Sequence, residues 1–265
     1  MKISAAMTEI QGERLATVLF DDNGHRGDVI LIHGFTGSKE DFTEIATLIA
    51  QHGYRVLTFD NRGQHESSHS NRPDAYSIDS FAKDVVDLAA DFGMTNPHLL
   101  GHSFGGLVAQ RATTLVPHVW KSLTLMCSGP GGRTEWDVEP AFENLGKVTM
   151  EEIWFKHFDE ERKAHPRYEI HKRRWIASDG LSTAAQGDLL VNQPSLVEEI
   201  AQLKIPTHVI YGENDDAWPI PDQNRMANEL GAEVSVLANC GHCPNEDNPE
   251  LTSRELTMFW DQVKN

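Results

Sequence analysis

The 265-residue chain predicts an α/β fold, in which helices flank a mostly parallel central sheet of about eight strands. Two observations carry this prediction. Short apolar runs rich in β-branched residues alternate with segments of helical periodicity, and continuous apolar runs are typical of strands buried on both faces of a parallel sheet. A segment of about seventy residues then interrupts the alternation. Because connections of helix length join parallel strands, we expect one large domain with a helical cap inserted after the sixth strand.

The individual elements follow from apolar spacing, capping residues and turn residues. An edge strand is expected at 14–20, and buried strands are expected at 28–32, 55–59, 97–100, 122–126, 205–211 and 233–237. Helices are expected between Ser38 and Gly53, at 78–92, directly after Ser103, at 222–230 and from about Pro249 onward.

The interruption opens with a Ser-Gly-Pro-Gly-Gly run at 128–132 and contains many charges but no convincing strand. We expect residues 1–130 and 201–265 to form the main domain and residues 131–200 to form the cap. The cap is rich in aromatic residues, among them Trp136, Trp154 and Trp175. Such residues either fill the small core of the cap or line a substrate pocket, and the sequence leaves both interpretations open.

The overall charge excludes some classes of partner. A formal net charge of −17 disfavours binding to nucleic acid or to an anionic membrane surface. We find no apolar run long enough for a signal peptide or a membrane span, and three cysteines are too few for a disulfide scaffold. We therefore expect a cytoplasmic monomer or homodimer that acts on a small molecule.

The most informative stretch is Gly101-His102-Ser103-Phe104-Gly105, where a strand passes directly into a helix. A turn without a polar loop is tight and strained, and the two glycines allow neighbouring elements to pack closely around it. A serine in such a turn is a candidate nucleophile. Glycine, serine and glycine could also fall at this spacing by chance, so the remaining catalytic groups must be sought.

A serine hydroxyl needs a base that accepts its proton and a group that orients the base. In a parallel sheet these groups gather at the carboxyl ends of the strands. Among thirteen histidines, His242 is the best placed, because it lies in the loop after the last expected strand. His33, His65 and His102 also lie near strand ends, and the glycine-flanked His33 and His102 are interpreted as structural.

The orienting acid should follow the strand at 205–211, where three carboxylates occur: Glu213, Asp215 and Asp216. Residue types alone leave the choice between the two aspartates open. The expected oxyanion donors are two backbone N–H groups, that of Phe104 after the nucleophile and that of Phe35 in the loop after an earlier strand.

The ordered motifs resemble the α/β-hydrolase superfamily, in particular its branch of serine esterases, lactonases and perhydrolases. His33-Gly34-Phe35 resembles the oxyanion loop, Asp60-Asn61-Arg62-Gly63 the turn after the next strand, Gly101–Gly106 the nucleophile elbow and Gly241-His242 the histidine loop. Gly212, Asp215 and Pro219 match the acid loop, so the resemblance implies that Asp215 is the acid. The sequence Gln64-His65-Glu66 departs from the family, which often has a second glycine in that turn.

The resemblance implies a cofactor-independent serine hydrolase that cleaves a small carboxylic ester or lactone through a covalent acyl-enzyme, with Ser103, Asp215 and His242 as its triad. The alternatives are a carbon–carbon bond hydrolase, a perhydrolase or haloperoxidase-like enzyme, and a receptor-like or non-hydrolytic (lyase or oxygenase) member of the fold. Trp154, Trp175 and Trp218 are the candidate substrate contacts and suggest an apolar acyl or ring-bearing substrate.

No cofactor is expected, and no metal is expected either. Cys240 and Cys243 flank His242 at zinc-ligand spacing. A second cysteine pair is missing from the sequence, however, and His242 is needed as the base. We therefore interpret the two cysteines as reduced thiols.

Overall fold

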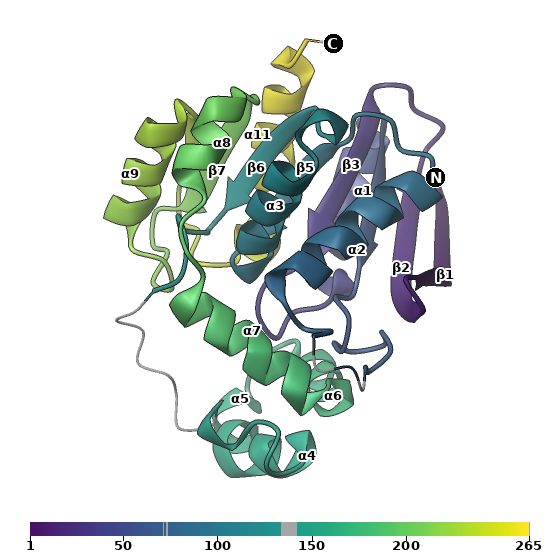
Figure 1. Ribbon diagram of the computed structural model, residues 1–265, viewed down its shortest axis with the longest axis vertical. Coiled ribbons are helices and arrows are strands. Elements are labelled where there is room, and N and C mark those ends of the chain that lie inside the picture. The colour runs from purple at the N-terminus through teal and green to yellow at the C-terminus, as the bar shows by residue number, and fades with distance from the viewer. Residues whose placement is uncertain (71, 73, 134–141, 265) are drawn as a thin grey trace.

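The computed structural model describes residues 1–70, 72, 74–133 and 142–264. Its strands form one sheet in the order β1-β2-β4-β3-β5-β6-β7-β8 (Figure 1). The strands are β1 (Lys2–Ile10), β2 (Glu13–Asp21), β3 (Gly27–Ile32), β4 (Tyr54–Phe59), β5 (His98–His102), β6 (Ser122–Met126), β7 (Thr207–Gly212) and β8 (Glu233–Leu237). Pairing is parallel from β4 to β8 and antiparallel where β2 joins β4 and β1 joins β2. The predicted sheet is confirmed.

No strand is expected from the sequence over the residues that form the first strand, β1. Most of its residues are exposed or half-buried, so β1 lacks the apolar pattern that marks a strand packed on a core. The central strands differ, because every residue of β5, β6 and β7 is buried. Burial on both faces explains why these strands were easy to recognise.

Helices flank the sheet in two packed rows. Helices α1 (Thr43–Gln51) and α11 (Pro249–Gln262) contact each other, while α2 (Ile78–Asp91), α3 (Phe104–Leu115), α8 (Val197–Leu203) and α9 (Ile220–Leu230) form the other row. Among the residues that the structure describes, no helix combines the length and apolar content that spanning a bilayer requires.

Between β6 and β7 the chain forms helices beyond the carboxyl ends of the parallel strands (Figure 1). They are α4 (Met150–Ile153), a π-helical turn at 154–158, α5 (Asp159–Arg162), α6 (Tyr168–Ala177) and α7 (Gly180–Asn192). The short helix α10 (Pro244–Asp247) does not belong to this segment and follows β8. The segment has its own small hydrophobic core, which contains Trp154 and Trp175. Residues 134–141 of the expected cap, including Trp136, lie outside the described residues.

The loop after β4 fastens α7 to the main domain. The Asp179 N–H donates to the Gly63 carbonyl (2.7 Å), and the Ser182 hydroxyl donates to the Arg62 carbonyl (2.9 Å). The sequence departure noted above lies in this loop, where His65 has φ 44°. The turn thus keeps a left-handed conformation that favours glycine, although a histidine occupies it.

A buried ion pair anchors the same loop. Arg62 Nε donates to Asp84 Oδ2 (2.6 Å), and their side chains are 0% and 1% exposed. Burial of a charged pair is costly unless each partner is satisfied. Arg62 also donates to the Ala75 carbonyl (3.3 Å), so the pair ties the turn after β4 to α2 and to the loop before it.

Candidate active site

Ser103 lies between β5 and α3 with φ 53° and ψ −118°, a strained conformation for a residue that is not glycine. A Cβ atom at Gly101 would lie 2.1 Å from the Gly105 carbonyl oxygen, and one at Gly105 would lie 2.3 Å from the Ile32 carbonyl oxygen. Any side chain at either position would therefore collide with backbone. The structure has the tight strand-to-helix turn that the sequence predicts.

Hydrogen bonds hold Ser103 in this conformation. Its N–H donates to the Met126 carbonyl (2.9 Å), and its carbonyl accepts a bond from the Ser128 hydroxyl (2.8 Å). The Ser103 hydroxyl in turn accepts a 3.4 Å bond from the Trp218 indole N–H. Strand β6 and the loop after it thus fix the backbone, while the hydroxyl lies against Trp218.

His242 is oriented by Asp215. The His242 Nδ1 atom lies 2.9 Å from Asp215 Oδ1, and the Asp215 side chain is fully buried. The same oxygen accepts the backbone N–H groups of Ala217 (3.1 Å) and Trp218 (3.2 Å), and Oδ2 accepts Gln223 Nε2 (2.8 Å). Burial acts to raise the pKa of Asp215, but these bonds and His242 outweigh it and hold the pKa below its ordinary value.

The neighbouring acids do not take this place. Asp216 is exposed, and Glu213 is exposed and accepts the backbone N–H of Asn239 (2.6 Å). Of the three carboxylates that follow β7, the structure brings Asp215 to His242. This is the choice that residue types alone left open.

Two other histidines near strand ends are held by backbone. His33 Nδ1 donates to the Gly34 carbonyl (2.8 Å), and its Nε2 accepts the Asn61 N–H (3.0 Å). His102 Nε2 donates to the His242 carbonyl (2.8 Å), and burial lowers the pKa of His102 to about 4. Both rings are therefore engaged in positioning loops, in agreement with their structural interpretation.

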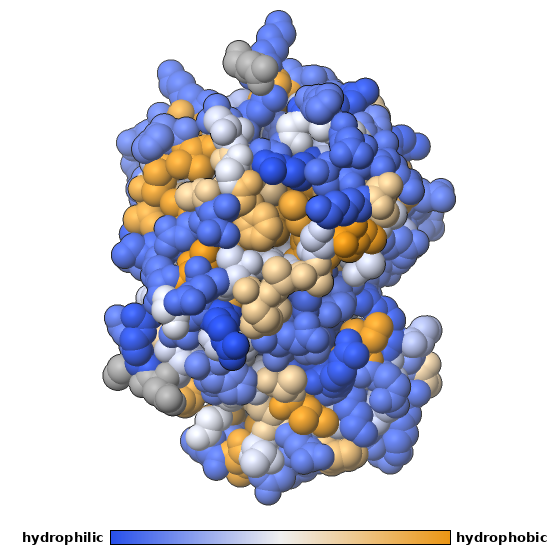
Figure 2. Space-filling view, turned by 90° about the vertical axis from the view of Figure 1, so that its right-hand side faces the viewer, coloured by the Kyte–Doolittle hydropathy of each residue, from blue (hydrophilic) through white to orange (hydrophobic). Residues whose placement is uncertain are grey.

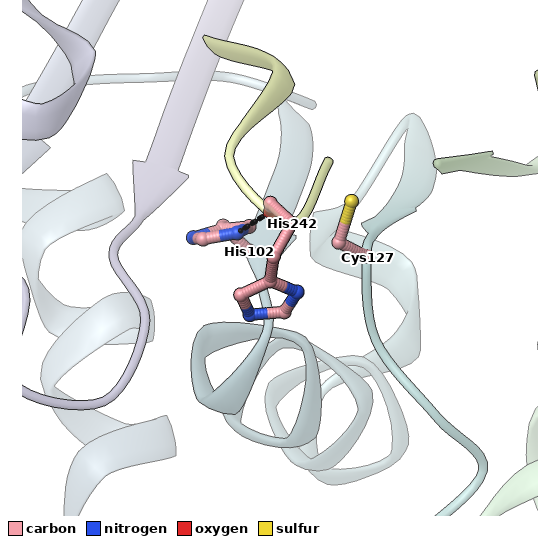
Figure 3. Close-up of side chains that lie close together, drawn as sticks. All are labelled: His102, Cys127 and His242. Atoms are coloured by element: carbon pink, nitrogen blue, oxygen red, sulfur yellow. Dashed lines mark hydrogen bonds between the residues drawn. The ribbon is translucent and has the colours of Figure 1, made fainter. Parts of the chain in front are cut away.

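His102, Cys127 and His242 gather at the ends of β5 and β6 and in the loop after β8 (Figure 3). Their donor atoms lie within 4.8 Å of one another, which is a spacing that a metal ion could use. The residues nevertheless do not fit a metal. His242 Nδ1 is bound to Asp215, and burial raises the pKa of the Cys127 thiol well above its ordinary value. A metal would therefore have to displace the Asp215–His242 bond and deprotonate a buried thiol.

The other cysteines of the histidine loop are protonated thiols too. Burial raises the pKa of Cys243 to about 12 and also raises that of Cys240. Neither residue belongs to the groups of potential metal ligands that the described part of the chain forms. The two sulfurs are thus at zinc-ligand spacing in the sequence, but in the described part of the structure they do not lie in a cluster of potential metal ligands.

The two predicted oxyanion donors lie beside Ser103. A Cβ atom at Gly34 would lie 3.2 Å from Ser103 Cβ, so the loop that carries Phe35 runs along the elbow. Phe104 is the first residue of α3, and N–H groups in the first turn of a helix have no partner within the helix. Both backbone positions are therefore near the hydroxyl that a substrate would approach.

Ser103 and His242 open onto a cavity of about 180 Å³, which is also lined by Phe35, Arg133, Leu190, Ala217 and Trp218. A second cavity of about 370 Å³ shares Phe35, Ser103 and His242 with the first. Its wall is strongly polar and includes Asp41, Arg162, His165, His171, Arg174, Glu246 and Asp247. Ser103 therefore lies where a small, mostly apolar cavity meets a larger polar one.

The three candidate tryptophans differ in position. Trp218 lines the smaller cavity, as expected of a substrate contact. Trp154 donates its indole N–H to Asp159 Oδ1 (3.2 Å) and Trp175 donates to the Met150 carbonyl (2.8 Å), and both pack in the small core of the inserted helices. Trp154 and Trp175 therefore fill the small core of the inserted helices and do not line the cavity at Ser103.

Sequence reasoning missed Arg133 and Leu190 in the smaller cavity. Leu190 is one of several apolar residues on α7, and nothing in the sequence indicates which of them faces Ser103. Arg133 follows Gly131-Gly132, and that glycine pair was a usable signal for a backbone that approaches another element closely.

The comparisons with known proteins agree with this fold. The model of the alpha/beta hydrolase family matches residues 29–255. The chain is 25% identical to the AB hydrolase superfamily protein YisY of Bacillus subtilis, over 94% of this chain and 97% of that protein. It is 27% identical to Lipase 3 of a Moraxella species, over 92% of this chain and 80% of that protein.

Among solved structures, the enol-lactonase from Burkholderia xenovorans superposes with a TM-score of 0.80 at 18% identity, covering 97% of this chain and 99% of the other. An N-acyl homoserine lactonase superposes with a TM-score of 0.82 at 18% identity, over 100% and 98% of the two chains. The fold, the arrangement around Ser103 and the family match over most of the chain lead to one conclusion: this protein belongs to the alpha/beta hydrolase family.

Proposed function

We propose that the protein is a cofactor-independent serine hydrolase that cleaves a small carboxylic ester or lactone, with Ser103, His242 and Asp215 as its catalytic triad. The observation that carries the proposal is the buried Asp215 carboxylate bonded to His242 Nδ1, beside a serine held in a strained elbow on the same cavity. The names of its relatives, which include a lipase and an enol-lactonase, support a carboxylic ester or lactone as the substrate.

Each group has a distinct task in the proposed reaction. Asp215 stays ionised and accepts a hydrogen bond from the Nδ1–H of His242, so that Nε2 is free to take the proton of the Ser103 hydroxyl. Ser103 Oγ then attacks the acyl carbon, and the backbone N–H groups of Phe35 and Phe104 stabilise the resulting oxyanion. The imidazolium returns its proton to the departing alcohol, which leaves the acyl group on Ser103.

Hydrolysis of the acyl-enzyme repeats these steps with water. His242 removes a proton from the water as it attacks the ester carbon, and the proton then passes to Ser103 Oγ as the acid is released. Asp215 accepts four hydrogen bonds, which keep its carboxylate in one position through both halves of the reaction.

We also propose that residues 131–200 act as a cap over this site. Leu190 of α7 lines the smaller cavity. On the same helix, a Cβ atom added at Gly187 would lie 3.8 Å from the Phe35 ring, so α7 passes close to Phe35. The cap therefore supplies one wall of the cavity that holds Ser103, and it determines which acyl groups fit there.

Hydrolysis of short p-nitrophenyl esters tests the proposed mechanism. We expect Ser103→Ala to lower kcat/KM by at least about 10⁴-fold, because loss of the nucleophile removes the covalent route. Ser77→Ala, which changes an exposed serine outside both cavities, should keep the wild-type activity. Undiminished hydrolysis by the Ser103 variant would refute the mechanism. Labelling of Ser103 by a fluorophosphonate without any ester turnover would instead favour a binding or non-hydrolytic role.

A further inference from the structure

Arg133 is a charged side chain on the wall of the smaller cavity, which the apolar side chains of Phe35 and Leu190 also line. Its guanidinium carbon lies 5.7 Å from the centre of the Trp218 ring, and its Nη1 donates to the Ala217 carbonyl. These contacts come from the loop that also carries Asp215. The guanidinium therefore lies against Trp218, whose indole N–H donates to the Ser103 hydroxyl on the same cavity.

Backbone contacts fix the position of Arg133 as well. The N–H groups of Gly132 and Arg133 donate to the carbonyls of Gln193 (2.6 Å) and Leu190 (2.7 Å) at the end of α7. A Cβ atom at Gly132 would lie 2.4 Å from the Val191 carbonyl oxygen, and one at Gly131 would lie 2.8 Å from that of Gln193. The glycine pair thus permits a close approach to α7, and this approach sets where the next side chain points.

The charge of Arg133 is not neutralised within the described part of the chain, where no carboxylate lies within 4.0 Å of its guanidinium. The nearby Asp215 carboxylate is fully buried and committed to His242. In a chain with 40 acidic and 23 basic residues, an arginine that lines the Ser103 cavity and has no acidic partner among the described residues is a feature that needs a purpose. A guanidinium binds a carboxylate through two parallel hydrogen bonds, which makes it suited to recognising an anionic group.

We propose that Arg133 is a specificity-determining residue that binds a carboxylate on the part of the ester in the smaller cavity. The preferred substrates are then short esters that carry a free carboxylate, with the connecting chain packed between Phe35 and Leu190. A cavity of about 180 Å³ suits a short group. This proposal rests on the proposed hydrolase function. The sequence suggests an apolar acyl or ring-bearing substrate, whereas this proposal gives the substrate a short apolar chain that ends in a carboxylate.

Two matched pairs of esters test the proposal from either side of the scissile bond. Monomethyl glutarate carries its carboxylate on the acyl side, and methyl 5-methylhexanoate is its neutral isostere. Similarly, 4-acetoxybutanoate carries the carboxylate on the alcohol side, and 4-methylpentyl acetate is its neutral isostere. For each pair the ratio of kcat/KM for the anionic ester to that for the neutral ester is measured by titration of the released acid.

We expect the wild-type protein to prefer the anionic ester in one of the two pairs, and we expect Arg133→Gln to lower that ratio by roughly 10- to 100-fold, the range for a hydrogen bond between charged partners. Arg133→Lys should restore part of the ratio, because it keeps the charge but not the planar fork. Arg225→Gln, which changes an arginine with a 59% exposed side chain on α9, should leave both the ratio and the activity unchanged. A ratio near one in both pairs, or a ratio that Arg133→Gln does not alter, would overturn the proposal.

Binding to an inactive variant separates this proposal from the hydrolase function. Calorimetric titration of Ser103→Ala protein with glutarate requires no turnover, and a second substitution, Arg133→Gln, should weaken glutarate binding by at least about tenfold. If no ester is cleaved but glutarate binding depends on Arg133, the hydrolase function fails and the carboxylate site stands. If esters are cleaved but glutarate binding is the same with and without Arg133, the carboxylate site fails and the hydrolase function stands.

Discussion

Substituting Asp215 by asparagine removes one charge from the site while preserving the shape of the side chain. Two backbone N–H groups, those of Ala217 and Trp218, point at Oδ1, so the asparagine oxygen will occupy that position and its NH₂ group will replace Oδ2. Gln223 has to turn its amide so that Oε1 accepts the new donor, and this turn gives up the bond from its Nε2 to the Trp218 carbonyl (3.1 Å). His242 Nδ1 thus keeps an acceptor at 2.9 Å, and its tautomer is unchanged.

The variant therefore loses the charge that stabilises the His242 imidazolium. It does not also lose the activity that a reversed His242 tautomer would remove. Opposite charges about 4 Å apart attract by about 4 kcal/mol at an effective dielectric constant of about 20. Because each 1.36 kcal/mol is about a factor of ten in rate, we expect kcat/KM to fall by about a thousandfold. The much larger effect that follows from a reversed tautomer, about 10⁴-fold in a comparable triad, is not expected.

The assay is hydrolysis of a short p-nitrophenyl ester by Asp215→Asn, with Asp216→Asn as the matched control. Asp216 is the exposed neighbour of Asp215, so its substitution should change kcat/KM by less than about twofold. Thermal unfolding of both variants shows whether the fold is kept. The reasoning would be refuted by a loss of less than tenfold in Asp215→Asn, or by an equal loss in both variants.

Two further predictions concern stability. Asp84→Asn leaves the buried Arg62 guanidinium without its counter-charge, so we expect a loss of about 3 to 5 kcal/mol in the free energy of unfolding measured in urea. As the control, Asp79→Asn breaks the exposed ion pair with Arg111 and should lower the free energy of unfolding by less than about 1 kcal/mol. Equal losses in the two variants would contradict the argument. Burial lowers the pKa of His208 from 6.5 to about 4, so the unfolded chain binds a proton that the folded one does not, and stability is lost as the pH falls from about 6.5 toward 4. Relative to the wild type, His208→Gln should reduce the loss of unfolding free energy between pH 8 and pH 5 by about 2 kcal/mol, whereas the same pH dependence in both proteins would show that His208 is not the group concerned.

The sequence was sufficient to predict a mostly parallel sheet and the order of its strands along the chain, apart from the first strand. Strands β3 to β7 are continuous apolar runs because both of their faces are covered by helices, and such a composition is visible without any structure. Strand β1 is not predicted from the sequence, because it is an edge strand with little buried surface and therefore lacks a continuous apolar run. The resemblance at the acid loop also selected Asp215 over Asp216 before their exposures were known.

The segment between β6 and β7 was the least predictable part of the chain. Its aromatic residues suggested a substrate pocket as readily as a small core, because aromatic side chains occur in both and the sequence does not show which surface they face. The three-dimensional packing separates the two cases, because Phe158 and Trp175 pack edge to face inside this segment, with ring centres 4.8 Å apart. Trp218, from the loop after β7, reaches Ser103 instead.

The tight turn at Ser103 can be predicted from sequence, since Gly101 and Gly105 lie two residues to either side of Ser103 and their effect is local. The lining of the cavity could not be predicted, because Arg133, Leu190 and Trp218 come from three separate segments of the chain that meet only in the folded protein. A local motif is encoded in the spacing of neighbouring residues, whereas a cavity wall depends on which faces of distant elements meet. For that reason the order of the motifs in the sequence was enough to propose the chemistry, whereas the proposal of an anionic substrate depends on the place of Arg133 in the wall of the Ser103 cavity.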